Sequence, residues 1–243
     1  MKEKIYTIPV NEAFDTPCEC PLCELDKKLD AEILDYILGP SYMEEDIREE
    51  TNKIGFCKYH YDKMFNARNH LGVALMVSTH LKSINKELDN ILKSEAKNEK
   101  GRGFLKKSQD KHPLADYTEH ISSSCYACKR MENRMNSYIE TIFFLLKREP
   151  EFKQKIANCK GFCLEHFSQL LSEAKRRMNE TEFAEFANII IPLQKENMAR
   201  LDEELDWFIR KFDYRFQDEP WKNSKDALER TILKIASVYV NEN

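Results

Sequence analysis

The residues with the clearest chemistry in this sequence are its eight cysteines and two of its six histidines. Most of them lie in two short motifs, CxxC and GFCxxH, and this pair of motifs occurs twice at almost the same separation. The first copy contains Cys20, Cys23, Cys57 and His60, and the second contains Cys125, Cys128, Cys163 and His166. The recurrence of both motifs predicts an internal duplication.

Each copy offers three thiolates and one imidazole, which is a ligand set of closed structural zinc sites. Within each motif the two ligands are three residues apart, so their side chains point the same way on a helix or tight turn. We therefore predict that each copy binds one Zn²⁺ through its own four residues, giving two ions per chain. Four protein ligands leave no open position for water, which argues against hydrolysis at either ion.

Other interpretations of the cysteines stay open. A buried free cysteine is a common core residue, and an iron–sulfur cluster could use the same ligands, although such clusters more often have four cysteines. A thiol–disulfide motif would use CxxC but would leave the histidine of GFCxxH unexplained. Cys18 and Cys159 fall outside the repeat, and we interpret them as packing residues beside the metal rather than as substitute ligands or redox-sensitive thiols.

The spacing of apolar residues predicts helices that begin at the ligands. We expect helices over 22–38, 42–52, 57–96, 125–147 and 150–158, a tract from Cys163 that Pro192 kinks or divides, and a last helix over 225–240. Gly55 and Gly161 are expected to turn the chain toward the metal, with the following phenylalanines packed beneath it. Strands are not expected, because six glycines in 243 residues are too few for a many-stranded fold.

The predicted fold is all-α, with duplicated helical modules that form a bundle and are each stapled by a Cys₃His metal site. We divide the chain into a first module over 1–98, a basic linker over 99–113, and a second module over 114–243 with a C-terminal helical extension. A heptad pattern within the first module suits a helical neighbour. Its members are Val77, Leu81, Ile84, Leu88 and Ile91.

The overall composition bears on location and partners. The net charge of −4 disfavours a double-stranded nucleic-acid binder, which is usually basic. The first residues lack the apolar run of a signal peptide, and the longest strongly apolar stretch is too short to span a bilayer. We therefore expect a cytoplasmic protein without a membrane partner, where cysteines more often bind metal than form disulfides. The aromatic residues near 207–221 are expected to pack in the core.

The motifs described above are also similar to those of a known protein family. With its CPLC start, its two GFCxxH elements, and the segments Phe212–Arg215 and Glu219–Trp221, the chain resembles an uncharacterised family of Firmicutes-type bacterial proteins of unknown function. The resemblance covers essentially the whole chain. It implies a helical fold and the same metal-ligand positions, and it implies no activity.

The sequence therefore favours a zinc-binding interaction or adaptor scaffold, which would contact another protein or associate with itself through helical faces. The alternative is a redox-responsive regulator that releases zinc when its thiols are oxidised. A nucleic-acid-binding protein or an enzyme is less favoured. Phosphate-loop, HExxH and nucleophile-elbow motifs are absent, so we nominate no catalytic residue.

Overall fold

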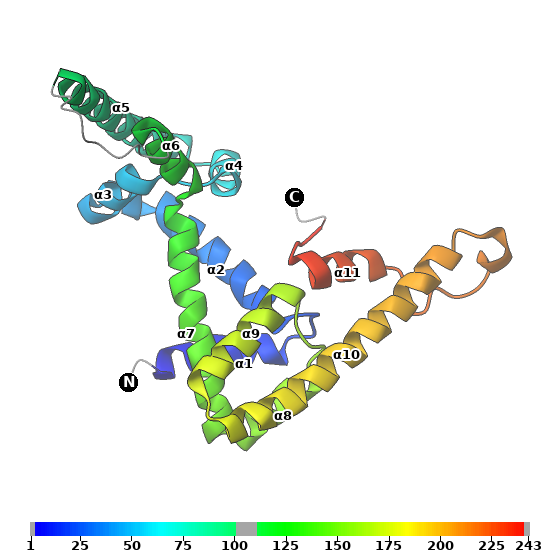
Figure 1. Ribbon diagram of the computed structural model, residues 1–243. Helices are drawn as coiled ribbons and strands as arrows, with labels where there is room; N and C mark the ends of the chain where they lie inside the picture. Colours follow the sequence, from blue (N-terminus) through cyan, green and yellow to red (C-terminus); the bar gives the residue numbers. More distant parts are fainter. Residues whose placement is uncertain (1–2, 101–110, 241–243) are drawn as a thin grey trace. The chain divides into compact units, whose positions relative to one another are not determined.

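The structure is a computed structural model that describes residues 3–100 and 111–240 (Figure 1). Within these residues the chain forms eleven α-helices, two short 3₁₀ helices and no strand. The prediction of an all-α fold is therefore confirmed. Most of the predicted linker 99–113 lies outside the described residues, and helix α6 begins at its last residue, Pro113.

The chain forms two compact units that differ from the predicted modules. The central unit comprises residues 29–133, and the terminal unit comprises residues 1–28 together with 134–243. Helices α2 (Pro21–Leu38) and α7 (Tyr126–Arg148) each run through a boundary between the units. A helix is a continuous rod, so each of these two carries the chain from one unit into the other. Each unit consequently contains part of both copies of the repeat.

The central unit contains the end of α2, the 3₁₀ helix η1 (Pro40–Met43), α3 (Glu45–Ile54), α4 (Lys58–Asn66), α5 (His70–Lys100), α6 (Pro113–Ser123) and the start of α7. The single helix expected over 57–96 is thus two helices. The side chain of Asn69 accounts for the break, because its Oδ1 accepts from the Gly72 N–H at 3.0 Å and its Nδ2 donates to the Leu38 carbonyl at 2.6 Å. An asparagine in this position caps the new helix.

Only part of α5 is covered by the rest of the central unit. Its first turns pack on α3, where Met76 is buried. Farther along, α6 lies beside it (Figure 1), but no residue of α6 is buried. Val77 and Leu81, two of the predicted heptad residues on α5, keep 39% and 54% of their surface exposed. The predicted heptad face is therefore present and incompletely covered.

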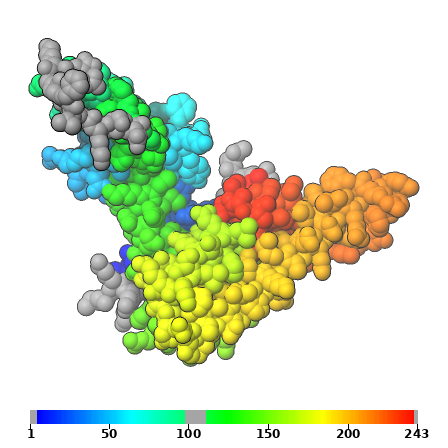
Figure 2. All heavy atoms as spheres, in the orientation of Figure 1, coloured from blue at the N-terminus to red at the C-terminus, as the bar shows by residue number. Residues whose placement is uncertain are grey.

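The terminal unit contains α1 (Glu3–Asp15), the start of α2, the end of α7, α8 (Pro150–Asn158), α9 (Leu164–Arg177), α10 (Glu180–Arg210), the 3₁₀ helix η2 (Tyr214–Phe216) and α11 (Ala227–Ala236). Its core includes Phe14, whose ring lies 5.1 Å from that of Phe152 and 6.3 Å from that of Phe162. Helix α11 packs on α9 and α10, as the red and yellow surfaces in Figure 2 show. The spacing of apolar residues does not predict α1.

The tract that follows Cys163 is divided at Asn179 and not at Pro192. Asn179 and Glu182 form a capping box, in which each side chain accepts from the other residue's backbone N–H, at 2.9 and 3.1 Å. Helix α10 then continues through Pro192. Pro192 and Asn188, whose carbonyl loses its helical partner, are both exposed, so water can satisfy that carbonyl.

The aromatic residues that follow α10 do not all pack as expected. Phe212 and Tyr214 are 72% and 81% exposed in the orange turn at the end of α10 (Figure 2). The turn itself is held by the buried Lys211, whose Nζ donates to the carbonyls of Phe216, Gln217 and Glu219 at 2.5–2.6 Å. None of the six aromatic residues from 207 to 221 is buried, so the prediction that they pack in the core is wrong.

Candidate metal clusters

The eight predicted ligand residues come together in two groups, but not in the predicted combination. The terminal cluster consists of Cys20, Cys23, Cys163 and His166, and the central cluster consists of Cys57, His60, Cys125 and Cys128. Within each cluster, the candidate ligand atoms lie within 4.8 Å of one another. Each CxxC motif therefore meets the CxxH motif of the other copy. The expectation that each copy gathers its own four residues is wrong.

The physical reason lies in helices α2 and α7. Each CxxC motif opens one of these helices, and each helix leaves the unit in which it begins. Cys20 and Cys23 stay in the terminal unit, whereas the chain that follows them enters the central unit and delivers Cys57 and His60 there. The two copies carry the same motifs, so the local spacing does not distinguish the two combinations.

All four motifs lie at helix starts, as the sequence predicts. Cys57 and Cys163 are the N-cap residues of α4 and α9, and Cys20 and Cys125 immediately precede α2 and α7. The second ligand of every motif lies in the first turn. Backbone N–H groups point at the sulfurs there: Cys128 N donates to Cys125 Sγ, and His166 N donates to Cys163 Sγ, both at 3.4 Å. Helix N-termini favour negative charge, so they stabilise thiolates.

In both clusters the histidine directs Nδ1 at the three sulfurs. His166 Nδ1 lies 3.6, 3.4 and 3.1 Å from the sulfurs of Cys20, Cys23 and Cys163. His60 Nδ1 lies 3.2, 3.3 and 3.4 Å from the sulfurs of its own cluster, which belong to Cys57, Cys125 and Cys128. One atom placed among four such groups would contact all of them. These distances make both clusters candidate metal sites.

The two glycines before the CxxH motifs have the predicted role. Gly55 and Gly161 adopt φ values of 59° and 77°, a region that side chains disfavour. A Cβ on Gly55 would lie 2.3 Å from His80 Nε2, and one on Gly161 would lie 2.8 Å from Gln194 Oε1. Phe56 and Phe162, which follow them, are both buried.

The side chains of Gln194 and His80 contact the backbone at or just before these two turns. Gln194 accepts from the Phe162 N–H at 2.9 Å and donates to the Phe162 carbonyl at 2.8 Å. His80 Nδ1 lies 2.8 Å from the carbonyl of Asn52, just before the other turn. Neither residue belongs to a recognisable motif, so the sequence analysis did not identify them.

The central cluster has a buried carboxylate behind its histidine. His60 Nε2 lies 2.9 Å from Asp30 Oδ1, and Lys63 Nζ lies 2.5 Å from the other oxygen of Asp30. Burial opposes protonation of His60, but the bonds to Asp30 and to the nearby sulfurs raise its pKa to about 10. Burial alone would raise the pKa of Asp30, but its contacts with His60 and Lys63 lower that pKa below the ordinary value. A carboxylate in this position directs the other ring nitrogen toward a metal.

A buried lysine of helix α11, Lys234, lies beside the terminal cluster. Lys234 is fully buried, and its Nζ donates to the carbonyl of Glu19 at 2.6 Å and to that of Lys160 at 2.5 Å. Burial lowers the pKa of Lys234. Just past α11, the Ser237 hydroxyl lies 3.1 Å from Cys163 Sγ. The C-terminal extension thus contacts the loops and one sulfur of this cluster.

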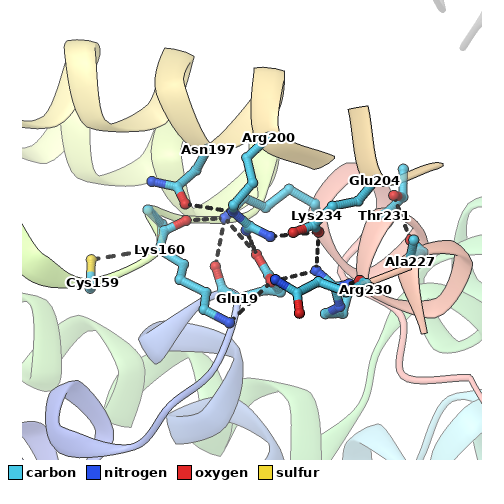
Figure 3. A network of polar contacts seen from close by, with 12 residues as sticks. Glu19, Cys159, Lys160, Asn197, Arg200, Glu204, Ala227, Arg230, Thr231 and Lys234 are labelled. Atoms are coloured by element: carbon cyan, nitrogen blue, oxygen red, sulfur yellow. Dashed lines mark hydrogen bonds and ion pairs between the residues drawn. The ribbon is translucent and has the colours of Figure 1, made fainter. Parts of the chain in front are cut away.

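Lys234 belongs to a larger network around the buried carboxylate of Glu19 (Figure 3). Arg200 contacts Glu19 at 2.6 Å, and Arg230 contacts it at 3.3 Å. Glu204 pairs with the same two arginines at 2.9 and 2.5 Å. Because Glu19 directly precedes Cys20, the network connects α10 and α11 to the loop that carries the first ligand. No sequence motif identified these residues as neighbours of the cluster.

Cys18 and Cys159 are not members of either cluster. Both are half-buried. Burial is the main cause that raises the pKa of Cys18 to about 12 and that of Cys159 to about 11. Thiols with such pKa values are poor nucleophiles at neutral pH, which favours the interpretation that they are packing residues.

The fold and the clusters define the class of this protein: it is all-helical, with two Cys₃His groups that could each hold a metal ion. The chain belongs to a family of unknown function, DUF6062, whose family model matches residues 1–242. No curated protein and no solved structure matches it. In the described residues, no helix is long and apolar enough to cross a membrane.

The combination of motifs can be tested by counting bound metal ions in paired variants. If the clusters hold one ion each, Cys20→Ser with Cys163→Ser should remove one ion per chain, because both residues belong to the terminal cluster. Cys20→Ser with Cys57→Ser should weaken both sites, although these residues come from the same copy. Native mass spectrometry in the presence of a competing chelator measures the difference. The opposite result would mean that each copy binds its own ion.

The network around Glu19 predicts a large effect of Lys234→Met. The substitution leaves the carbonyls of Glu19 and Lys160 without the buried donor that now satisfies them, so we expect the free energy of unfolding to fall by roughly 3 kcal/mol. Urea denaturation of the zinc-loaded chain, followed by circular dichroism, measures this change. The matched control is Lys225→Met, because Lys225 is exposed. Equal effects of the two substitutions would contradict the structural role of Lys234.

Proposed function

We propose that the chain binds two zinc ions, one in each cluster, through all eight predicted ligand residues. The observation that carries the proposal is the spacing of the ligand atoms. A tetrahedral zinc with bonds of about 2.3 Å to sulfur and about 2.0 Å to nitrogen separates sulfur from nitrogen by roughly 3.5 Å and two sulfurs by roughly 3.8 Å. The sulfur–nitrogen distances of 3.1–3.6 Å and the 3.8 Å between the sulfurs of Cys57 and Cys128 fit this geometry.

The same spacing favours zinc over an iron–sulfur cluster. In a multi-iron cluster the protein ligands are divided among two or more irons, so the ligand atoms surround a body of several atoms. Here the four ligand atoms of each cluster lie within 4.8 Å of one another, which suits a single ion. The donor set of three thiolates and one imidazole is also one that zinc commonly takes.

The role proposed for each ion is structural. Each cluster joins a CxxC motif to a CxxH motif that is at least 65 residues away in the sequence and belongs to the other copy. Structural zinc binds finger peptides with about 10–16 kcal/mol, which is comparable to or larger than the stability of a small domain. Removing the ions should therefore unfold much of the ligand-bearing regions.

The staple proposal predicts different outcomes for two neighbouring cysteines. Cys163→Ser removes a proposed ligand, so we expect loss of one zinc and a drop in melting temperature of 10 °C or more, roughly the effect of several kcal/mol. Cys159→Ser should keep both ions and change the melting temperature little. Native mass spectrometry and thermal circular dichroism report the two quantities. A metal-free chain with full helicity and an unchanged melting temperature would refute the structural role.

The cellular role that we propose is that of an interaction scaffold that works through helical faces. The support is the heptad face of α5, where Val77 and Leu81 are 39% and 54% exposed. Helix α6, which packs beside α5, has no buried residue. Helices with an apolar seam of this spacing pair with other helices. A second copy of the chain is the simplest such partner.

Self-association through this face is tested by Leu81→Lys. We expect the zinc-loaded chain to gain mass with concentration in sedimentation equilibrium. The variant should keep its zinc and helicity but stay monomeric, because a charge would be buried in the seam. Lys82→Glu, on the neighbouring exposed position, is the matched control. A wild-type chain that is monomeric at every concentration would contradict self-association.

A second candidate function is that of a redox-responsive regulator that releases zinc. The observation in its favour is that Cys128 is exposed in the central cluster. A cytoplasmic location accords with both candidates, because all eight cysteines are free of disulfides and reducing compartments keep thiols in this state. We propose no catalytic activity and no nucleic-acid ligand.

A further inference from the structure

The two clusters differ sharply in their access to solvent. In the terminal cluster all four ligand residues are buried, with Cys20 and Cys163 at 0% exposure. In the central cluster His60 and Cys125 are buried, Cys57 is half-buried and Cys128 is exposed. The sequence repeat gives the two copies equal ligands, so this difference arises from what covers them.

The cover of the terminal cluster is the C-terminal segment, which has no counterpart in the first copy of the repeat. Helix α11 packs on α9, the helix that begins at Cys163. The Ser237 hydroxyl lies 3.1 Å from Cys163 Sγ, and Tyr239 donates to the carboxylate of Glu24, beside Cys23, at 2.8 Å. A reagent from solvent would have to displace this segment to reach the sulfurs.

The exposed edge of the central cluster consists of two sulfurs that are already close. Cys57 Sγ and Cys128 Sγ lie 3.8 Å apart. A disulfide bond is about 2.05 Å long, so the two sulfurs must approach by less than 2 Å. The other two ligands are anchored: Cys125 is 7% exposed, and His60 is held by Asp30 at 2.9 Å. Oxidation at this edge can therefore proceed while the buried half of the cluster stays in place.

We propose that the central cluster is an oxidation site for peroxides, at which a disulfide between Cys57 and Cys128 forms and zinc leaves. This inference rests on the proposed zinc binding. The Cys128 thiolate attacks one oxygen of the peroxide, the O–O bond breaks, and hydroxide or alkoxide departs, which leaves a sulfenic acid on Cys128. The Cys57 thiolate then attacks that sulfur and expels hydroxide. The two sulfurs lose two electrons in total, and the peroxide gains them.

Zinc release follows from the loss of ligands. Each thiolate that enters the disulfide gives up its charge and its bond to the metal. His60 and Cys125 alone supply two protein ligands, whereas a structural zinc site needs four. The terminal cluster keeps its ion because the same peroxide cannot reach its sulfurs at a comparable rate. Reduction of the disulfide by a thiol restores both thiolates, so the site can be reloaded.

The test treats the full chain, loaded with two zinc ions, with hydrogen peroxide in the presence of a chromogenic chelator. We expect one zinc per chain to leave at least tenfold faster than the second. Peptide mapping at that point should find the Cys57–Cys128 disulfide, and dithiothreitol with added zinc should restore the original metal content. Equal release rates, earlier release from the terminal cluster, or a disulfide between other cysteines would each overturn the inference.

A variant that keeps the central ion separates oxidation from a general loss of the site. Cys128→His retains four ligands as a Cys₂His₂ set, which also binds zinc, but it cannot form the disulfide with Cys57. We expect its fast phase of zinc release to slow at least tenfold, whereas Cys163→His in the terminal cluster should leave the fast phase unchanged. An unchanged fast phase in Cys128→His would overturn the inference.

The zinc content before treatment distinguishes a failure of the proposed zinc binding from a failure of the proposed oxidation site. A chain that binds no zinc would overturn the proposed function and this inference together. A chain that binds two ions and releases both at the same rate would leave the proposed function intact and overturn the oxidation site alone.

Discussion

The constraint on which the structure depends is the gathering of three sulfurs and one imidazole within a few ångströms at each cluster. Three thiolates so close together repel one another, and the fold counters this repulsion with positively polarised groups. Two helix N-termini converge on each cluster, and backbone N–H groups point at sulfurs in both. The buried turns at Gly55 and Gly161 exist because the CxxH half of each cluster must reach the CxxC half.

Both clusters lie at two converging helix N-termini, but the charged residues around them differ. Behind the central cluster lies a carboxylate, Asp30, which orients His60 through Nε2. Beside the terminal cluster lies a buried cation, Lys234, whose charge is set against Glu19 in the network of Figure 3. A zinc ion bound there by three thiolates and a neutral imidazole would carry a formal charge of −1, which a nearby lysine would stabilise. The duplicated motif has thus been placed in two distinct electrostatic environments.

The crossed combination of motifs makes each half of the chain dependent on the other. Neither copy of the repeat contains a complete cluster, because α2 and α7 each begin at a CxxC motif in one unit and continue into the other. Each cluster therefore takes two ligands from each copy of the motif pair.

Much of this protein follows from its sequence alone. The helical class, the glycine turns and the helix starts at Cys20, Cys57, Cys125 and Cys163 depend on local spacing, which acts within a few residues. The divisions at Asn69 and Asn179 also depend on local caps, with Gly72 and Glu182 three residues further on, but the spacing of apolar residues does not indicate them. Tertiary structure alone decided which motifs meet, which sulfurs stay exposed, and that Asp30, Glu19 and Lys234 lie behind the ligands. The two copies carry the same motifs, so only the paths of α2 and α7 through the fold could select between the combinations.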